Sequence, residues 1–259
     1  MASVKPGKRS RRTSELVQEA KPARKRSNDG QEDFNQIPAL IRQTAGSSPQ
    51  KPPLEVLKRA SAKCRACDLW KQATQTVFGE GNASALVMLV GEQPGDREDI
   101  EGKPFVGPAG KLLREAMLAA EIDPHDAYLT NVVKHFRWMT AGRGKRRIHK
   151  KPRQSEINAC HPWLEAELEA VTPKVLVCLG ATAAKALLGS HFSVSQERGK
   201  VVPSSLACAV VTTVHPSSIL RSPDSDSRRR EMQSFVRDLR KVAQLIRSER
   251  AKPSVAATT

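Results

Sequence analysis

Clusters of polar residues follow two apolar runs of the sequence and are candidates for chemistry. The apolar run Ala85–Glu92 ends in the polar segment Gly91-Glu92-Gln93-Pro94-Gly95-Asp96, and Glu98 and Asp99 follow shortly after it. Acids packed this closely would repel a phosphate, so the segment suits acid–base chemistry or the stabilisation of positive charge on a sugar. A polar turn with a capping aspartate is the structural alternative.

The second polar cluster is His215-Pro216-Ser217-Ser218, which directly follows the apolar run AVVTTV. A histidine at the carboxyl end of a strand can donate a hydrogen bond to a leaving group that becomes anionic. Taken alone, this short motif favours a structural histidine. Arg221, six residues after His215, lies where a contact to a phosphate or to the loop would help.

A strongly basic segment spans residues 134–153 and holds nine Lys or Arg and no acid. On charge alone it is a flap that grips phosphates, and His149 is one polar residue within it. Four cations flank His149 and are expected to lower its pKa, which favours the neutral imidazole: Arg146, Arg147, Lys150 and Lys151.

Five cysteines are an odd and modest number, which disfavours a disulfide scaffold and favours metal binding or burial. Cys64 and Cys67 form a C-x-x-C motif at the end of an expected helix, and Cys160 opens another helix. Cys178 and Cys208 lie in apolar strand-like runs, which predicts buried, unreactive thiols. Three candidate metal ligands remain.

Strand-like and helix-like runs alternate between about Leu54 and Arg247. Strands are expected in 85–92, 127–133, 174–180 and 207–216. Helices are expected in 54–67, 107–122, 155–171, 181–189 and 229–246, with Ser155 capping the third and Gly189 closing the fourth. The alternation predicts an α/β fold with three layers, α/β/α, around a central parallel four-stranded sheet. In such sheets ligands bind at the carboxyl ends of the strands, where the loops GEQPGD, TNVVKH, LGATA and VHPSS lie.

The chain is strongly basic. Its 259 residues carry a formal net charge of +16, which predicts a polyanionic partner, either nucleic acid or an anionic membrane surface. No run of about 18 apolar residues is present to span a membrane. The start MASVKPGKRSRRTSE lacks the apolar core of a secretory signal, so a soluble intracellular protein is expected.

The basic excess is uneven along the chain. Residues 1–53 hold 11 Lys or Arg and 5 acids without apolar periodicity, which predicts a disordered basic tail. Such a tail can tether DNA or simply keep the protein in solution, and the sequence favours neither. Residues 54–247 are expected to form one domain, and residues 248–259 a frayed C-terminal tail.

Four motifs occur in a fixed order around the predicted sheet: GEQPGD, EGKPFVGPAG, Thr130-Asn131 and HPSS. In this combination residues 54–247 resemble the iron–sulfur branch of the uracil-DNA glycosylase superfamily. The basic insert KRRIH (Lys145 to His149) is similar to that of its X-type members. The resemblance implies the uracil-DNA glycosylase-like fold and a role in DNA repair.

The resemblance also implies roles for individual residues. Phe105 would stack on an extruded uracil, for which core packing is the alternative, and Asn131 would read the Watson–Crick edge of the base. His215 would stabilise uracil O2 as the glycosidic bond breaks, and His149 would act as the nucleophile in place of water. The remaining residues would support the sugar cation (Glu92, Gln93 and Asp96) or bind the substrate (Asp99 and Arg221).

The resemblance completes the set of metal ligands. Ordinary members of the family have a cysteine after the TNVVK segment, where this chain has His135, so the implied ligands are Cys64, Cys67, His135 and Cys160. The family implies a [4Fe–4S] cluster. From spacing alone, zinc held by three cysteines and one histidine is equally acceptable.

The function implied is excision of uracil from DNA followed by covalent capture of the deoxyribose by His149. Two alternatives stay open: a turnover glycosylase that uses water, and a nucleic-acid-binding module without chemistry. The expected partner is uracil-containing DNA, preferably single-stranded, and no membrane. The protein is expected to be a monomer in the cytoplasm, associated with the nucleoid.

Overall fold

The computed structural model describes residues 52–140 and 146–252. The predicted basic tail lies outside the described residues except for Pro52 and Pro53, and so does the predicted C-terminal tail from residue 253 onward. Within the described part of the chain, no helix is both long and apolar enough to cross a membrane.

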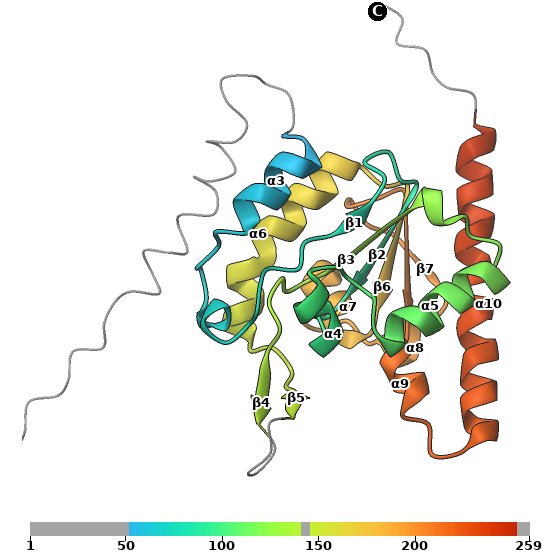
Figure 1. Ribbon diagram of the computed structural model, residues 1–259. Helices are drawn as coiled ribbons and strands as arrows, with labels where there is room; N and C mark the ends of the chain where they lie inside the picture. The colour runs from blue at the N-terminus through green and yellow to red at the C-terminus, as the bar shows by residue number, and fades with distance from the viewer. Residues whose placement is uncertain (1–51, 141–145, 253–259) are drawn as a thin grey trace, which may run out of the picture.

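A six-stranded sheet runs through the centre of the protein, in the order β1-β3-β2-β6-β8-β7 (Figure 1). The four inner strands are parallel, and a short antiparallel strand pairs with each edge. The predicted four-stranded parallel sheet is confirmed as the inner part of this sheet. The strands are β1 (Glu80–Gly81), β2 (Val87–Gly91), β3 (Ala127–Asn131), β6 (Val175–Leu179), β7 (Val201–Val202) and β8 (Ala209–Thr213).

Helices cover both faces of the sheet and complete the predicted three layers. Alternate residues of β2 face opposite sides: Val87 and Leu89 join one core cluster, and Met88 and Val90 join the other. The first cluster is closed by α5 (Pro108–Ala119), α9 (Pro216–Leu220) and α10 (Ser225–Ala251). The second is closed by α3 (Leu54–Ser61), α6 (Gln154–Val171) and α7 (Ala181–Leu188). Burial on both faces explains why the inner strands are continuous apolar runs.

Shorter elements occupy the connections. They are the 3₁₀ helices η1 (Asp68–Lys71) and η2 (Pro124–Asp126), the helices α4 (Asp96–Glu101) and α8 (Val194–Glu197), and the hairpin strands β4 (Trp138–Thr140) and β5 (Arg147–His149). The segment predicted as a basic loop therefore contains a β-hairpin, in which Trp138 pairs with His149. The hairpin projects beyond the carboxyl edge of the sheet (Figure 1).

Four local predictions are corrected by the structure. Helix α3 ends at Ser61, so Cys64 and Cys67 lie in the loop that follows it. Helix α6 starts at Gln154, and the Glu156 carboxylate accepts a hydrogen bond from the Arg153 N–H at 2.6 Å, so Ser155 is not the cap. Helix α10 continues to Ala251, past the predicted domain end at Arg247.

The fourth correction concerns a cysteine. Cys208 is exposed, because β8 begins only at Ala209, and the prediction of a buried thiol there is wrong. Cys178 is buried in β6 as predicted, and burial raises the pKa of its thiol to about 12.

Candidate active site

Three of the residues expected to bind a base converge on Gly91, the last residue of β2. A Cβ atom added to Gly91 would lie 2.4 Å from Asn131 Oδ1, 2.8 Å from Phe105 Cζ and 3.5 Å from His215 Nε2. Asn131 ends β3, which pairs in register with β2, and His215 follows β8. The parallel topology thus places an aromatic ring, an amide and an imidazole around one point, and any residue larger than glycine would fill it.

Phe105 is held in an unusual backbone conformation. Its φ of 55° lies in the left-handed region, which is uncommon for a bulky residue. The Phe105 carbonyl accepts a hydrogen bond from Arg114 at 2.7 Å, and it lies so close to Gly110 that a side chain there would collide with it. The ring stacks at 28° to His215, with centroids 6.3 Å apart. Residues held in this way are typical of sites where strain is compensated by surrounding contacts.

His215 has its proton placed by its neighbours. It caps α9, and its Nδ1 accepts a hydrogen bond from the Ser217 N–H at 3.2 Å. A neutral imidazole that accepts at Nδ1 carries its proton on Nε2, the atom that faces Gly91. Burial lowers the pKa of His215 to about 4, and the charges of His149 and Arg221 act in the same direction. His215 is therefore a neutral donor that faces Gly91, and Phe105, Asn131 and His215 around Gly91 form the candidate base pocket.

Arg221 lies beside this donor on the exposed side of the site. Its guanidinium donates a hydrogen bond to Ser217 Oγ at 3.1 Å, and Ser217 Oγ lies 2.8 Å from His215 Nδ1. The arrangement supports the orientation of His215 and holds an exposed cation beside it.

His149 is the last residue of strand β5 and faces Glu92, which follows the carboxyl end of β2. Its Nε2 lies 3.6 Å from Glu92 Oε1 and 2.9 Å from the side-chain nitrogen of Gln93. In the tautomer that carries its proton on Nδ1, His149 has its lone pair on Nε2 and can accept from the Gln93 amide nitrogen. Burial lowers the pKa of His149, Arg221 lowers it further, and Glu92 opposes both. The predicted direction holds, but Arg221 rather than the four flanking residues supplies the cationic contribution.

Gln93 joins the hairpin to the sheet. Its side chain is buried, its amide nitrogen donates to the carbonyls of Arg137 (3.2 Å) and Lys150 (2.9 Å), and its oxygen accepts from the Arg137 N–H at 3.1 Å. These bonds bridge both strands where the hairpin begins. Gln93 thus determines where His149 lies.

Asp96 and Asp99 anchor the hairpin through Arg147. The guanidinium of Arg147 lies 2.5 Å from a carboxylate oxygen of each aspartate and covers the Trp138 ring. Asp99 has no exposed surface and also accepts a hydrogen bond from the Thr74 N–H at 2.9 Å. In the structure the partners of the predicted substrate-binding Asp99 are Arg147 and Thr74, so Asp99 supports Arg147 and through it the hairpin.

Two further side chains complete the site: Thr182, which was not singled out from the sequence, and Glu98, which was named there only as a member of the acidic cluster. Thr182, in α7, donates a hydrogen bond from its hydroxyl to Glu92 Oε2. The buried Glu98 accepts from the Gly107 N–H at 2.9 Å and so closes the loop that carries Phe105. The only signal for Thr182 was its place in LGATA, one of the four loops at the carboxyl edge of the sheet.

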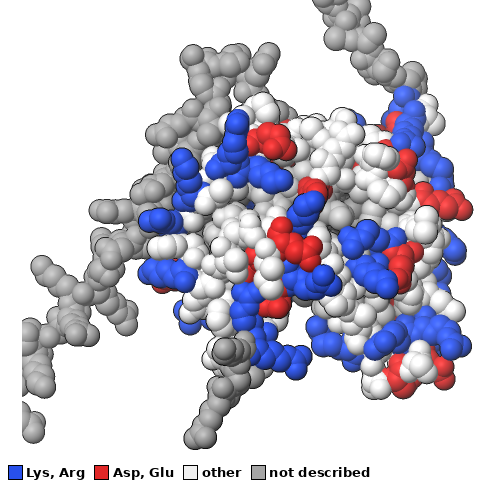
Figure 2. Space-filling model, in the orientation of Figure 1, with Lys and Arg blue, Asp and Glu red and all other residues white. Residues whose placement is uncertain are grey.

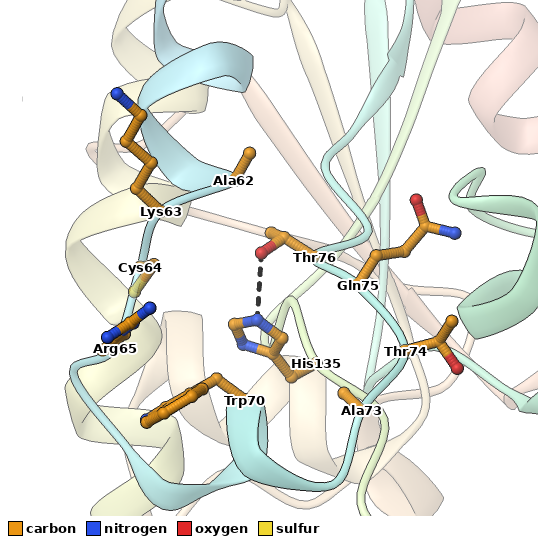
Figure 3. Close-up of a pocket in the computed structure, with 10 residues that line it drawn as sticks. All are labelled: Ala62, Lys63, Cys64, Arg65, Trp70, Ala73, Thr74, Gln75, Thr76 and His135. Carbon is orange, nitrogen blue, oxygen red and sulfur yellow. Dashed lines mark hydrogen bonds between the residues drawn. The ribbon is translucent and has the colours of Figure 1, made fainter.

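Two of the four predicted metal ligands, Cys64 and His135, line a separate cavity of about 380 Å³ together with Arg65, Trp70 and others (Figure 3). Cys67 and Cys160 are not among its lining residues. His135 Nε2 lies 2.9 Å from the Thr76 hydroxyl. Cys160 Sγ accepts a hydrogen bond from the Lys134 N–H, and Cys64 Sγ accepts one from Trp163 Nε1, both at 3.2 Å.

This donor set does not suit a single ion. Among the described residues, no three His, Cys, Asp or Glu side chains lie close enough together to hold one metal ion. Zinc needs its four ligands within about 2.0–2.3 Å of one point. A cubane cluster spreads its ligands around a larger core and is stabilised by hydrogen bonds to sulfur. The N–H···S contacts to Cys64 and Cys160, and the open space beside Cys64 and His135, therefore fit a cluster better than a single zinc ion.

Basic side chains lie on both sides of the site (Figure 2). Lys150, Lys151 and Arg153 are exposed near the hairpin, and a second exposed group follows His215 at the corner between α9 and α10: Arg221, Arg228, Arg229 and Arg230. Exposed cations therefore follow both His149 and His215 in the chain, and they are suited to contact a phosphate backbone.

Comparison with known proteins agrees with this geometry. The family model of the uracil DNA glycosylase superfamily matches residues 78–240. A Type-4 uracil-DNA glycosylase of Thermotoga maritima is 34% identical over 197 residues, which cover 76% of this chain and 96% of that protein. Those of Archaeoglobus fulgidus (34% over 199 residues, 74% and 92%) and Sulfurisphaera tokodaii (36% over 181 residues, 66% and 77%) are similarly close. The chain therefore belongs to the uracil DNA glycosylase superfamily.

Proposed function

We propose that this protein excises uracil from DNA and then captures the deoxyribose covalently through His149, as an X-type member of the superfamily. The main support is the convergence of Phe105, Asn131 and His215 on Gly91, with His149 and Glu92 at the rim of the same pocket. These residues would bind a flipped pyrimidine, and His149 would then face the deoxyribose.

Bond cleavage in this mechanism relies on His215. An extruded base needs a surface to stack on and polar groups along its edge, which Phe105 and Asn131 supply. As the bond from C1′ to uracil N1 breaks, its electron pair leaves with the base, and negative charge grows on uracil O2. The Nε2–H of His215 is already directed into the pocket, so it stabilises this charge without reorganisation.

Capture uses the lone pair of His149. The Nε2 of the imidazole forms a bond to the electron-poor C1′, and the ring becomes a cation. It returns to neutrality by losing its Nδ1 proton to solvent, while the uracil anion takes up one proton, so protons balance. A positioned imidazole competes with water through its high effective concentration. The C–N bond formed has a poor leaving group, so the protein stays attached.

The test is a denaturing gel of protein incubated with uracil-containing single-stranded DNA. We expect a heat-stable shifted band for the wild type. His149→Ser should abolish that band yet still release uracil, because the smaller side chain leaves room for water. His215→Ala should instead slow bond cleavage by about 10²–10³-fold, since the departing base loses its donor.

Other outcomes would select a different function. An adduct that persists in His149→Ser places the nucleophile elsewhere. An abasic site without any shift in the wild type indicates a turnover glycosylase, and unchanged DNA indicates a binding module without chemistry. We expect single-stranded DNA to be the better substrate, because no base pair has to be opened before flipping.

We also propose a [4Fe–4S] cluster held by Cys64, Cys67, His135 and Cys160. When bound, it would tie the loop after α3 to the end of β3 and to α6, as a structural link between three segments. Anaerobically purified protein should be brown and contain about four irons per chain. A colourless protein with one zinc per chain would contradict this assignment.

A further inference from the structure

Thr182 occupies a position from which it can control the carboxylate at the rim of the pocket. The residue is buried in the first turn of α7, and its hydroxyl donates to Glu92 Oε2. We propose that Thr182 is a positioning residue for covalent capture, which holds Glu92 so that its other oxygen faces His149. This inference rests on the proposed function.

The two oxygens of Glu92 have different partners. Oε2 accepts the Thr182 hydroxyl, and Oε1 lies 3.6 Å from His149 Nε2. The Glu92 side chain is 22% exposed, so without the threonine hydroxyl its carboxylate could rotate toward water. A single hydrogen bond therefore decides which way the free oxygen points.

Thr182 itself is fixed by its surroundings. Gly180 precedes α7 with a φ of 89°, and its N–H donates to the Thr213 carbonyl of β8 at 2.8 Å. Ala183 and Ala184 are fully buried behind Thr182. The turn also abuts His215, because a Cβ added to Gly180 would lie 3.0 Å from His215 Cβ. The hydroxyl is thus presented from a rigid corner shared with the leaving-group donor.

The orientation of Glu92 matters most during capture. Before the reaction His149 is neutral, with its lone pair on Nε2. A neutral ring gains little from the Glu92 carboxylate, whose Oε1 lies 3.6 Å from that atom. As the bond from Nε2 to C1′ forms, the imidazole becomes cationic and the same carboxylate stabilises it. Such an interaction is stronger in the transition state than in the ground state, so it accelerates the step.

The consequence is a shift in the competition between His149 and water. When capture slows, more of the sugar cations formed after uracil release are trapped by water. The ratio of adduct to released uracil therefore falls, although uracil release continues. A merely destabilised protein would lose both products in proportion and keep this ratio.

The experiment measures that ratio in a single turnover with the full-length protein in excess over uracil-containing DNA. Thr182→Val removes the hydroxyl at nearly constant shape, and Thr182→Ser retains it. Because the hydroxyl orients a charged partner, we expect the ratio to fall about tenfold in Thr182→Val. Thr182→Ser should stay close to wild type.

Thr213→Val is the matched control. Thr213 is also buried, but its hydroxyl donates to Asp238 on α10 at 2.7 Å, so its loss should leave the ratio unchanged. Because the ratio is counted per uracil released, it does not depend on how much of a variant folds, and Thr182→Ala serves as a second variant.

The possible failures are distinguishable. A wild type that releases uracil without any adduct overturns the proposed function. A wild type that forms the adduct, with Thr182→Val at the same ratio, overturns only the role of Thr182. An equal fall of the ratio of adduct to released uracil in Thr182→Val and Thr182→Ser would also overturn the role of Thr182, because the serine retains the hydroxyl.

Discussion

Burial and one hydrogen bond decide which proton His215 offers to a leaving group. Its Nδ1 accepts the Ser217 N–H, so the proton of the neutral ring stays on Nε2. The pKa of about 4 keeps the ring neutral across the physiological range. The groups that face it, His149 and Arg221, favour the same neutral form when they are charged. Donor placement at this site therefore does not depend on moderate changes of pH.

The lowered pKa of His215 predicts a loss of stability in acid. The folded pKa lies below the unfolded value of about 6.5, so between these values the unfolded chain binds more protons. The contribution is complete above pH 6.5 and is lost as the pH falls toward 4. It is at most about 3 kcal/mol.

The measurement is the free energy of unfolding at pH 7.5 and pH 4.5. Wild type and His215→Gln are compared, so that contributions from other groups cancel. We expect the wild type to lose more stability than the variant on acidification. If wild type and His215→Gln lost the same free energy of unfolding between pH 7.5 and pH 4.5, His215 would have an ordinary pKa.

At the scale of elements, a buried ion pair joins the strand that carries Asn131 to helix α6. Glu167 of α6 is fully buried and accepts from the Gly79 N–H at 2.9 Å and from Tyr128 at 3.0 Å. Lys134 Nζ pairs with Glu167 and donates to the Asn131 carbonyl at 2.7 Å. Burial and the Glu167 charge raise the pKa of Tyr128. The network holds the end of β3 beside Cys160.

Removing one charge of this pair should destabilise the fold more than removing both charges. Glu167→Leu leaves the ammonium of Lys134 buried without its counterion, and we expect a loss of about 3–5 kcal/mol. The double variant Glu167→Leu, Lys134→Met removes both charges and should recover a large part of that loss. Denaturant unfolding measures both. A double variant less stable than Glu167→Leu would show that Lys134 is satisfied without Glu167.

At the scale of the whole molecule, charge is divided between the domain and the N-terminal segment. Residues 1–53 contribute +6 of the net +16. In the described domain, exposed cations gather near the hairpin and at the start of α10 (Figure 2). Base selection by Phe105, Asn131 and His215 is separate from these phosphate-binding charges.

Removing residues 1–53 should weaken DNA binding without changing base choice. Each Lys or Arg that neutralises a phosphate adds to the salt dependence of binding, so the slope of log affinity against log salt should become flatter. Affinity is measured between about 50 and 200 mM salt, with uracil- and thymine-containing strands. A truncated protein that loses its preference for uracil would place the segment in the site.

The order of the elements and the positions of the polar loops follow from the sequence alone. The runs that became β2, β6 and β8 are apolar throughout because both faces are buried, and that pattern is local. Parallel strands bring their carboxyl ends to one edge, so His215 and Asn131 were expected to share a site with the GEQPGD loop. Helix ends were less predictable: the segment through Cys67 reads as helical, yet α3 stops at Ser61.

Tertiary structure alone decided how the charged residues are used. In the sequence, Asp99 and Glu92 are both carboxylates of one acidic segment. Packing buries Asp99 against Arg147, 48 residues away, and leaves Glu92 partly exposed beside His149. Thr182 meets Glu92 across 90 residues, and Arg221 rather than the flanking cations contributes to the low pKa of His149. Burial and distance between charges set pKa values and hydrogen bonds. Both are created only when segments far apart in the chain pack together.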